Sequence, residues 1–180
     1  MRKLTIVAII LMAFVAVMVA AQDKPAEKPK EAAAAAHAFV GADKCKMCHK
    51  AEFDAWSKTK HAKAFEALKP EEQKKAECVI CHTTGKTAEA VELNGVQCEA
   101  CHGAGADYKK PTIMNAAKWK ADSTAQFKLM KEAGLTLPVE ADCMRCHKQE
   151  GNPNFKPFDF AKMHLLVHPI AAAAPAPAGK

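Results

Sequence analysis

Four short stretches of the chain share the pattern Cys-x-x-Cys-His, and all eight cysteines of the sequence fall into these pairs. The pairs are Cys45 and Cys48, Cys78 and Cys81, Cys98 and Cys101, and Cys143 and Cys146, followed by His49, His82, His102 and His147. This pattern is the attachment signal of c-type haem, in which two thiols form thioethers to the porphyrin and the imidazole binds the iron. The sequence therefore predicts four covalently attached haems.

Zinc sites and structural disulfides are the alternative interpretations of paired cysteines. A zinc ribbon needs two such pairs for each tetrahedral ion and has no use for a histidine directly after each pair. Disulfides form in oxidising compartments and do not require adjacent histidines. Because every pair has its histidine and no cysteine is left over, the pattern as a whole favours haem.

Each haem iron has a second axial position, and four histidines outside the motifs are candidates to fill it. They are His37, His61, His164 and His168. The arithmetic permits four haems with two imidazoles each, an arrangement that favours electron transfer. An iron with a single protein ligand would instead be open to a substrate or an inhibitor.

His61 falls within a stretch that has helical periodicity. A helix over residues 50–68 would place His61 on the same side as Phe53 and Trp56, although charged residues interrupt that apolar side. In a protein with four haems, a neutral imidazole on such a side is most simply explained as an iron ligand.

The other candidate ligands lie near the two ends of the chain. Prolines at 153 and 157 indicate a loop, and residues 158–168 are expected to form a last helix. His164 and His168 would share one face of that helix, so that one of them can ligate a haem, or both if they reach different haems. His37 follows an alanine run, and a tail residue is an equally good interpretation of it.

Local signals predict two further elements. Residues 123–126 resemble a capping box, and Gly134 and Pro138 are typical terminators, which together predict a short helix over residues 124–133. The turn signal Asn94-Gly95 lies in the 15-residue stretch between the second and third motifs, so their haems are expected to lie close together. Residues 103–105 suit a backbone that turns sharply or passes close to a flat ring.

The two ends of the chain differ in composition from its middle. Residues 1–21 have the positive start, apolar run and small final residues of a secretory signal peptide cleaved near Ala21; an uncleaved membrane anchor is the alternative. Residues 22–38 and 171–180 are expected to be a flexible linker and an Ala/Pro-rich tail. Residues 39–170 would then form one domain, exported to the periplasm and without stable membrane insertion.

The basic composition does not indicate a nucleic-acid partner. The formal net charge is +6, and removal of Arg2 and Lys3 with the signal peptide would lower it to +4. Each ferric haem with two ionised propionates adds about −1, so the oxidised protein would be nearly neutral. Lysines between residues 44 and 75 would pair with propionates or dock an acidic partner, or simply form a solvated surface.

Residues around the motifs resemble the tetrahaem cytochrome c-554 family. The similar segments are Cys45-Lys-Met-Cys-His-Lys-Ala-Glu with Trp56, His61-Ala-Lys-Ala and Leu68-Lys-Pro, then Glu77-Cys-Val-Ile-Cys-His, and Gly95-Val-Gln-Cys-Glu-Ala-Cys-His-Gly-Ala-Gly. The resemblance implies a mostly α-helical fold with four closely packed haems and little regular strand. It also implies a periplasmic electron carrier that accepts electrons from hydroxylamine oxidoreductase and passes them towards the membrane.

The resemblance also implies roles for individual histidines. His61 corresponds to the distal ligand of the third haem, and His164 or His168 to that of the fourth, while the second haem corresponds to a five-coordinate one. The family places the distal histidine of the first haem shortly after the third motif, where this chain has none. The substitutes in this chain are His37, Met114 (which would raise the haem's potential), or the spare member of the His164/His168 pair.

Three functions follow from these patterns. The first is a periplasmic electron carrier that passes electrons between redox partner proteins by haem-to-haem hopping, and not an enzyme. The second is a haem enzyme that binds or reduces a small nitrogen oxide at an open iron. The third is a filament-forming cytochrome in which His37 or His168 ligates a haem of a neighbouring molecule.

Overall fold

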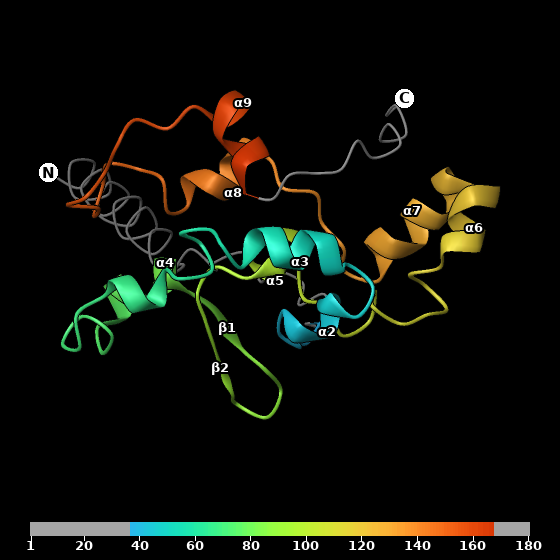
Figure 1. The fold of residues 1–180 in the computed structure, drawn as a ribbon, viewed down its shortest axis with the longest axis horizontal. Coiled ribbons are helices and arrows are strands. Elements are labelled where there is room, and N and C mark those ends of the chain that lie inside the picture. Colours follow the sequence, from blue (N-terminus) through green and yellow to red (C-terminus); the bar gives the residue numbers. More distant parts are fainter. Residues whose placement is uncertain (1–36, 168–180) are drawn as a thin grey trace, which may run out of the picture. The chain divides into compact units, whose positions relative to one another are not determined.

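Short helices dominate residues 37–167, the part of the chain that the computed structural model describes (Figure 1). The helices are α2 (Asp43–Lys46), α3 (Lys50–Trp56), α4 (Ala76–His82), α5 (Cys98–His102), α6 (Ala116–Ala121), α7 (Ser123–Glu132), α8 (Glu140–Met144) and α9 (Phe160–Met163), with the 3-10 helices η1 (Phe65–Ala67) and η2 (His164–Leu166). The prediction of a mostly α-helical chain with little strand is confirmed. The predicted signal peptide, the C-terminal tail and His168 lie outside these residues.

The predicted helix over residues 50–68 is wrong in length, because α3 ends at Trp56. The Ser57 hydroxyl donates to the carbonyl of Asp54 at 3.0 Å, and the Thr59 hydroxyl donates to that of Trp56 at 2.7 Å. Hydroxyl groups that bond nearby backbone in this way compete with helical hydrogen bonds. His61 therefore lies in a turn between α3 and η1 and not on a helix face.

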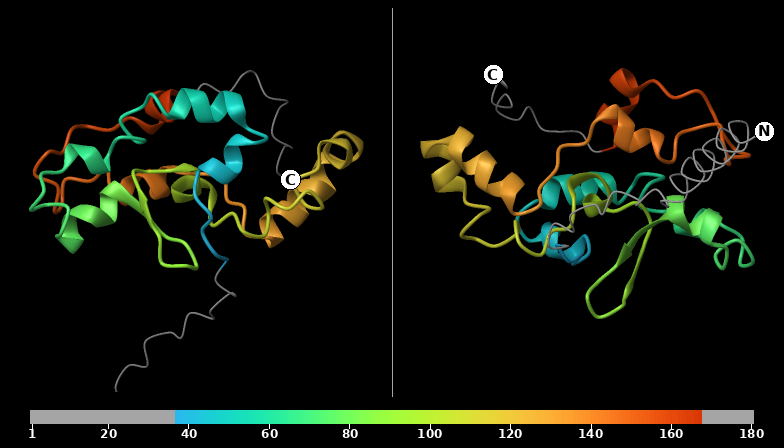
Figure 2. Two further views of the ribbon diagram at one scale, coloured as in Figure 1. Left: turned by 60° about the horizontal axis from the view of Figure 1, so that its bottom comes forward. Right: turned by 180° about the vertical axis from the view of Figure 1, so that it is seen from behind.

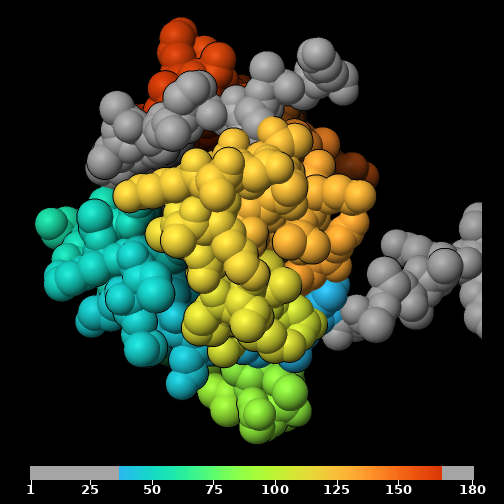
Figure 3. All heavy atoms as spheres, turned by 90° about the vertical axis from the view of Figure 1, so that its right-hand side faces the viewer, coloured from blue at the N-terminus to red at the C-terminus, as the bar shows by residue number. Residues whose placement is uncertain are grey.

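The predicted helix over residues 124–133 is observed as α7, although its cap differs from the expected one. The Asp122 carboxylate, one residue earlier than predicted, accepts from the backbone N–H of Ala125 at 2.9 Å. Asp122 also ends α6, so the two helices share one junction residue. They pack through an edge-on contact of Trp119 with Phe127, whose ring centroids are 6.5 Å apart. In the space-filling view, α6 and α7 lie on the face towards the viewer (Figure 3).

One hairpin was not anticipated from the sequence. Strands β1 (Thr83–Lys86) and β2 (Glu92–Asn94) pair antiparallel, and the hairpin projects away from the helices in both views of Figure 2. The loop lies between the strands, where Ala90 has a positive φ of 62°. The Asn94-Gly95 signal instead marks the end of β2, where the chain bends at Gly95 with φ of 79°.

The predicted last helix over residues 158–168 is shorter and less regular than expected. It consists of the single turn α9 followed by η2. Asp159 caps it by accepting from the backbone N–H of Lys162 at 3.3 Å. Among the described residues, no helix is long and apolar enough to cross a lipid bilayer.

Side chains alone supply very little core. The apolar residues that are buried in the described part of the chain are Ala42, Leu93, Tyr108 and Met130. Large apolar side chains are exposed instead, including Met47 at 85%, Ile80 at 74% and Leu166 at 72%. Because Met47 and Ile80 are the spacer residues of the first and second motifs, uncovered apolar surface lies directly beside the cysteine pairs.

Candidate haem-binding sites

Each Cys-x-x-Cys-His motif forms about one turn of helix. The second and third motifs lie within α4 and α5, and the first and fourth begin in α2 and α8. In the first, the N–H of His49 donates to the carbonyl of Cys45 at 2.9 Å, and in the fourth that of His147 donates to Cys143 at 3.0 Å. Residues three and four apart lie on one side of a helix, so the spacing gathers two thiols and one imidazole on the same side.

Two of the motif histidines have an orientation that suits iron binding. Nδ1 of His82 lies 2.6 Å from the carbonyl oxygen of Ala64, and Nδ1 of His102 lies 3.3 Å from that of Thr136. A carbonyl can only accept, so Nδ1 is the donor and carries a proton in each ring. This is the tautomer in which a histidine binds a metal through Nε2.

The thiols of different motifs meet in two places. A hydrogen bond between the thiols of Cys45 and Cys98 raises the pKa of Cys45 and lowers that of Cys98. Burial, and then a hydrogen bond with Cys81, raises the pKa of Cys146 to about 12. The first motif therefore adjoins the third, and the second adjoins the fourth.

The eight thiols are free, and seven of them are neither fully buried nor fully exposed; Cys48 is exposed. Burial also raises the pKa of Cys101 and Cys143. Within residues 37–167, no three side chains among His, Cys, Asp and Glu are grouped so as to hold a metal ion by themselves.

The ring of His61 lies beside that of His147, the motif histidine of the fourth site, with 6.0 Å between the ring centroids. Burial lowers the pKa of both rings, and the proximity of His147 lowers that of His61 further. Both are therefore neutral at neutral pH, which is the form that binds iron. The backbone carbonyl of His61 accepts from Val96, close to the third motif, at 2.9 Å. That His61 is a ligand, and which haem it reaches, stay predictions.

The other predicted ligands occupy different settings. His164 is exposed, stacks on Phe160 at 4.6 Å between ring centroids, and has its Nδ1 2.5 Å from the Phe160 carbonyl oxygen. His37 has its Nδ1 2.8 Å from a carboxylate oxygen of Asp107. Met114 lies in a turn before α6, and its backbone N–H donates to Lys110 at 2.8 Å. The roles of His164 and Met114 as ligands stay predictions.

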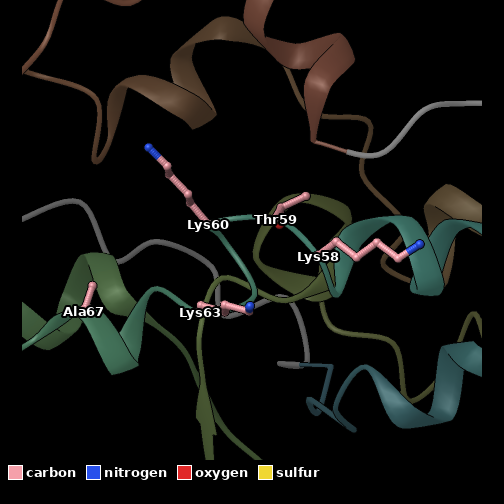
Figure 4. A pocket seen from close by; sticks show the side chains of 5 residues that line it. All are labelled: Lys58, Thr59, Lys60, Lys63 and Ala67. Atoms are coloured by element: carbon pink, nitrogen blue, oxygen red, sulfur yellow. The ribbon is translucent and has the colours of Figure 1, made fainter.

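A basic hollow of about 450 Å³ lies in the turn after α3 (Figure 4). Lys58, Thr59, Lys60, Lys63 and Ala67 line it. The three lysines are exposed, and their ammonium groups point in different directions. The hollow is thus a basic surface and not a convergent anion site.

The described residues fit a large, flat, apolar group at each motif. Each helical turn presents two free thiols and one imidazole on one side, and the described residues bury only four apolar side chains. A porphyrin attached on that side of each turn would supply apolar contact area and be held by the residues around it.

The sequence interpretation missed three residues that shape these sites. Glu99 is a spacer of the third motif, yet its side chain is fully buried and accepts from the backbone N–H groups of Val40, Gly41 and Gly105. Asp107 holds His37, and Thr136 holds His102. The sequence did carry a signal for Glu99, because an acidic residue between the two cysteines of a motif is visible there. No local pattern marked Asp107 or Thr136.

Comparisons with known proteins agree with the geometry. The family model described as cytochrome c554 and c-prime matches residues 44–103. Cytochrome c-554 of Nitrosomonas europaea is 33% identical over an alignment of 141 residues, and the match covers 64% of this chain and 60% of that protein. The structure of reduced cytochrome c554 from the same organism matches with a TM-score of 0.51 and 29% identity, over 71% of this chain and 76% of that one. The resemblance stated from the motifs is thereby confirmed.

Proposed function

We propose that this chain, which is similar to cytochrome c-554, is an electron carrier in which four covalent c-type haems relay electrons between partner proteins. The observation that carries this proposal is the set of four helical turns, each presenting two thiols and an imidazole on one side. The meeting of thiols from the first and third motifs, and from the second and fourth, supports short distances between the bound groups. The chain spans 60% of the length of the curated relative, so the partners are inferred for this chain from its own surface.

The residues of each site have separate tasks in this proposal. The two cysteines tether the haem, and the motif histidine binds its iron from one side. Carbonyl groups such as that of Ala64 hold the imidazole in the required orientation. Haem iron supplies one-electron redox chemistry when bound, and the protein fixes the distance and orientation between the groups.

The predicted leader supports a location of the carrier outside the cytoplasm. Residues 1–21 have the composition of a secretory signal, and thioether attachment of haem takes place after export in bacteria. The exposed lysines around the hollow of Lys58, Lys60 and Lys63 would steer an acidic redox partner to the protein. We propose a periplasmic location on this basis.

Mass spectrometry of the full chain, matured in a bacterial host that attaches c-type haem, tests the proposal. We expect a protein cleaved near Ala21 that carries four haems. The double substitution Cys98→Ala/Cys101→Ala should remove one haem, whereas Met47→Ala, which changes a spacer of the first motif, should leave all four. Mature protein without added macrocycles, or with zinc in their place, would refute the proposal.

Electron transfer is tested on the same material. The reduced protein is mixed with an acidic redox protein, and reoxidation is followed from the haem absorption bands. We expect fast reoxidation that slows as salt is raised, because screening weakens the attraction between exposed charges. A reduced protein that passes no electrons to any redox partner would contradict the carrier function.

A further inference from the structure

The imidazole of His37 is held by a carboxylate. Its Nδ1 lies 2.8 Å from Oδ2 of Asp107, and the other oxygen of Asp107 accepts from the ammonium of Lys110 at 2.6 Å. The two carboxylate oxygens of Asp107 are the acceptors of these two hydrogen bonds. Nδ1 therefore carries the proton, and within residues 37–167 no hydrogen bond engages Nε2.

This arrangement is the one that metal-binding histidines adopt. A carboxylate or carbonyl oxygen on one ring nitrogen fixes the tautomer, turns the ring and leaves the other nitrogen for the metal. His82 and His102, two motif histidines, are held by carbonyl oxygens at Nδ1 in the same sense. His37 shares their orientation although it lies outside every motif.

The ring of His37 rests in a cradle that only glycine permits. A Cβ built on Gly134 would come within 2.6 Å of Cδ2 and 3.1 Å of Nε2 of His37. The backbone beside the ring is also fixed, because the N–H of Ala106 donates to the carbonyl of Ala38 at 3.1 Å. With its side chain only 30% exposed, His37 is an anchored residue of the folded unit.

The surroundings of the cradle indicate which haem His37 would reach. The carbonyl of Thr136, two residues after Gly134, lies 3.3 Å from Nδ1 of His102, so the segment that packs on His37 also contacts the third motif. The motif that adjoins the third is the first, through the thiols of Cys45 and Cys98. The chain also runs from His37 directly into α2, where the first motif begins.

We propose that Nε2 of His37 is the second axial ligand of the haem held by Cys45, Cys48 and His49, with Asp107 as the positioning residue of that ligand. This inference rests on the proposed function, since it requires haem at the first motif. It assigns a ligand from the segment before the first motif to the iron of that motif.

The test is His37→Gly in the full, matured chain, studied by mass spectrometry and by electron paramagnetic resonance of the oxidised protein. We expect four haems in both proteins and one additional high-spin iron per molecule in the variant. Added imidazole should restore the low-spin signal by filling the vacated position. A variant with the wild-type number of low-spin irons overturns the inference, whereas wild-type protein without four haems overturns the proposed function instead.

Two further variants separate ligation from structural support. Asp107→Asn keeps His37 in place but removes the negative charge that makes the imidazole a stronger ligand, so the low-spin signal should persist while one reduction potential rises. Unchanged reduction potentials would show that Asp107 does not position the ligand, and this measurement can still be made if the His37→Gly protein fails to mature.

A Cys45→Ala/Cys48→Ala background tests which haem His37 binds. His37→Gly should add no high-spin iron in this background, and an additional high-spin iron would overturn the assignment to the first haem.

Discussion

Glu99 is the residue on which the contact between the N-terminal segment and the third motif depends. It is 2% exposed, and its carboxylate accepts from the backbone N–H groups of Gly41 at 2.7 Å, Gly105 at 2.6 Å and Val40 at 3.0 and 3.1 Å. A single side chain between two haem-attaching cysteines thus fixes the segment that carries His37 and leads into the first motif.

Replacing Glu99 by Gln should lower stability by about 2 kcal/mol or more, because both oxygens accept and an amide NH2 would face a backbone N–H donor. Thermal unfolding of the matured protein measures the loss. Glu77→Gln is the matched control, since Glu77 also lies beside a motif cysteine but is exposed, and its effect should stay within about 0.5 kcal/mol. Equal melting temperatures for the two variants would show that the buried contacts of Glu99 are not needed.

At the scale of elements, the link between β2 and α5 is joined to the turn that carries His61. The backbone N–H of Val96 donates to the carbonyl of His61 at 2.9 Å, and the carbonyl of Val96 accepts from the Trp56 indole at 2.8 Å. Gly95 makes this close approach possible, because a Cβ there would lie 2.5 Å from the carbonyl oxygen of Ala62. The third motif and His61 are therefore positioned by one shared contact.

Gly95→Ala and Gly151→Ala form a matched pair that tests this contact. Both glycines have positive φ, 79° and 71°, but nothing lies within 4 Å of a Cβ at Gly151. Gly151→Ala should cost only the left-handed conformation, about 1 to 2 kcal/mol. Gly95→Ala should cost about 1 to 3 kcal/mol more because of the overlap with Ala62. Thermal unfolding gives both values, and equal losses would contradict the close approach.

At the scale of the whole molecule, the described residues lack the apolar core that a chain of this length normally has. Four buried apolar side chains cannot offset the conformational entropy that ordering residues 37–167 costs. Haem is thus expected to be a structural component of the fold as well as the redox centre.

The chain made in the cytoplasm without residues 1–21, where haem is not attached, should therefore not fold. We expect a weak helical signal in far-ultraviolet circular dichroism, rapid digestion by a protease and no cooperative melting, in contrast to the matured protein. Helices as short as those observed have little stability on their own. A haem-free chain that melts cooperatively with the helical signal of the matured protein would contradict this view.

What the sequence by itself determined is local chemistry. A motif of five residues fits within about one helical turn, so its two thiols and imidazole meet on one side whatever the rest of the chain does. For the same reason the signals at residues 123–126, Gly134 and Pro138 predicted α7, although its cap is Asp122. The helix expected over residues 50–68 was wrong because apolar periodicity does not register the hydroxyl groups of Ser57 and Thr59, which end α3.

The tertiary structure decided what lies next to what. His37 meets Asp107 across 70 positions of the chain, and Val40 meets Glu99 across 59. No local pattern encodes such a contact, because it depends on how loops fold back and on where glycines allow close approach. The sequence therefore left His37 between a tail residue and a ligand, and only the tertiary structure shows that its ring is anchored against Gly134 and Asp107.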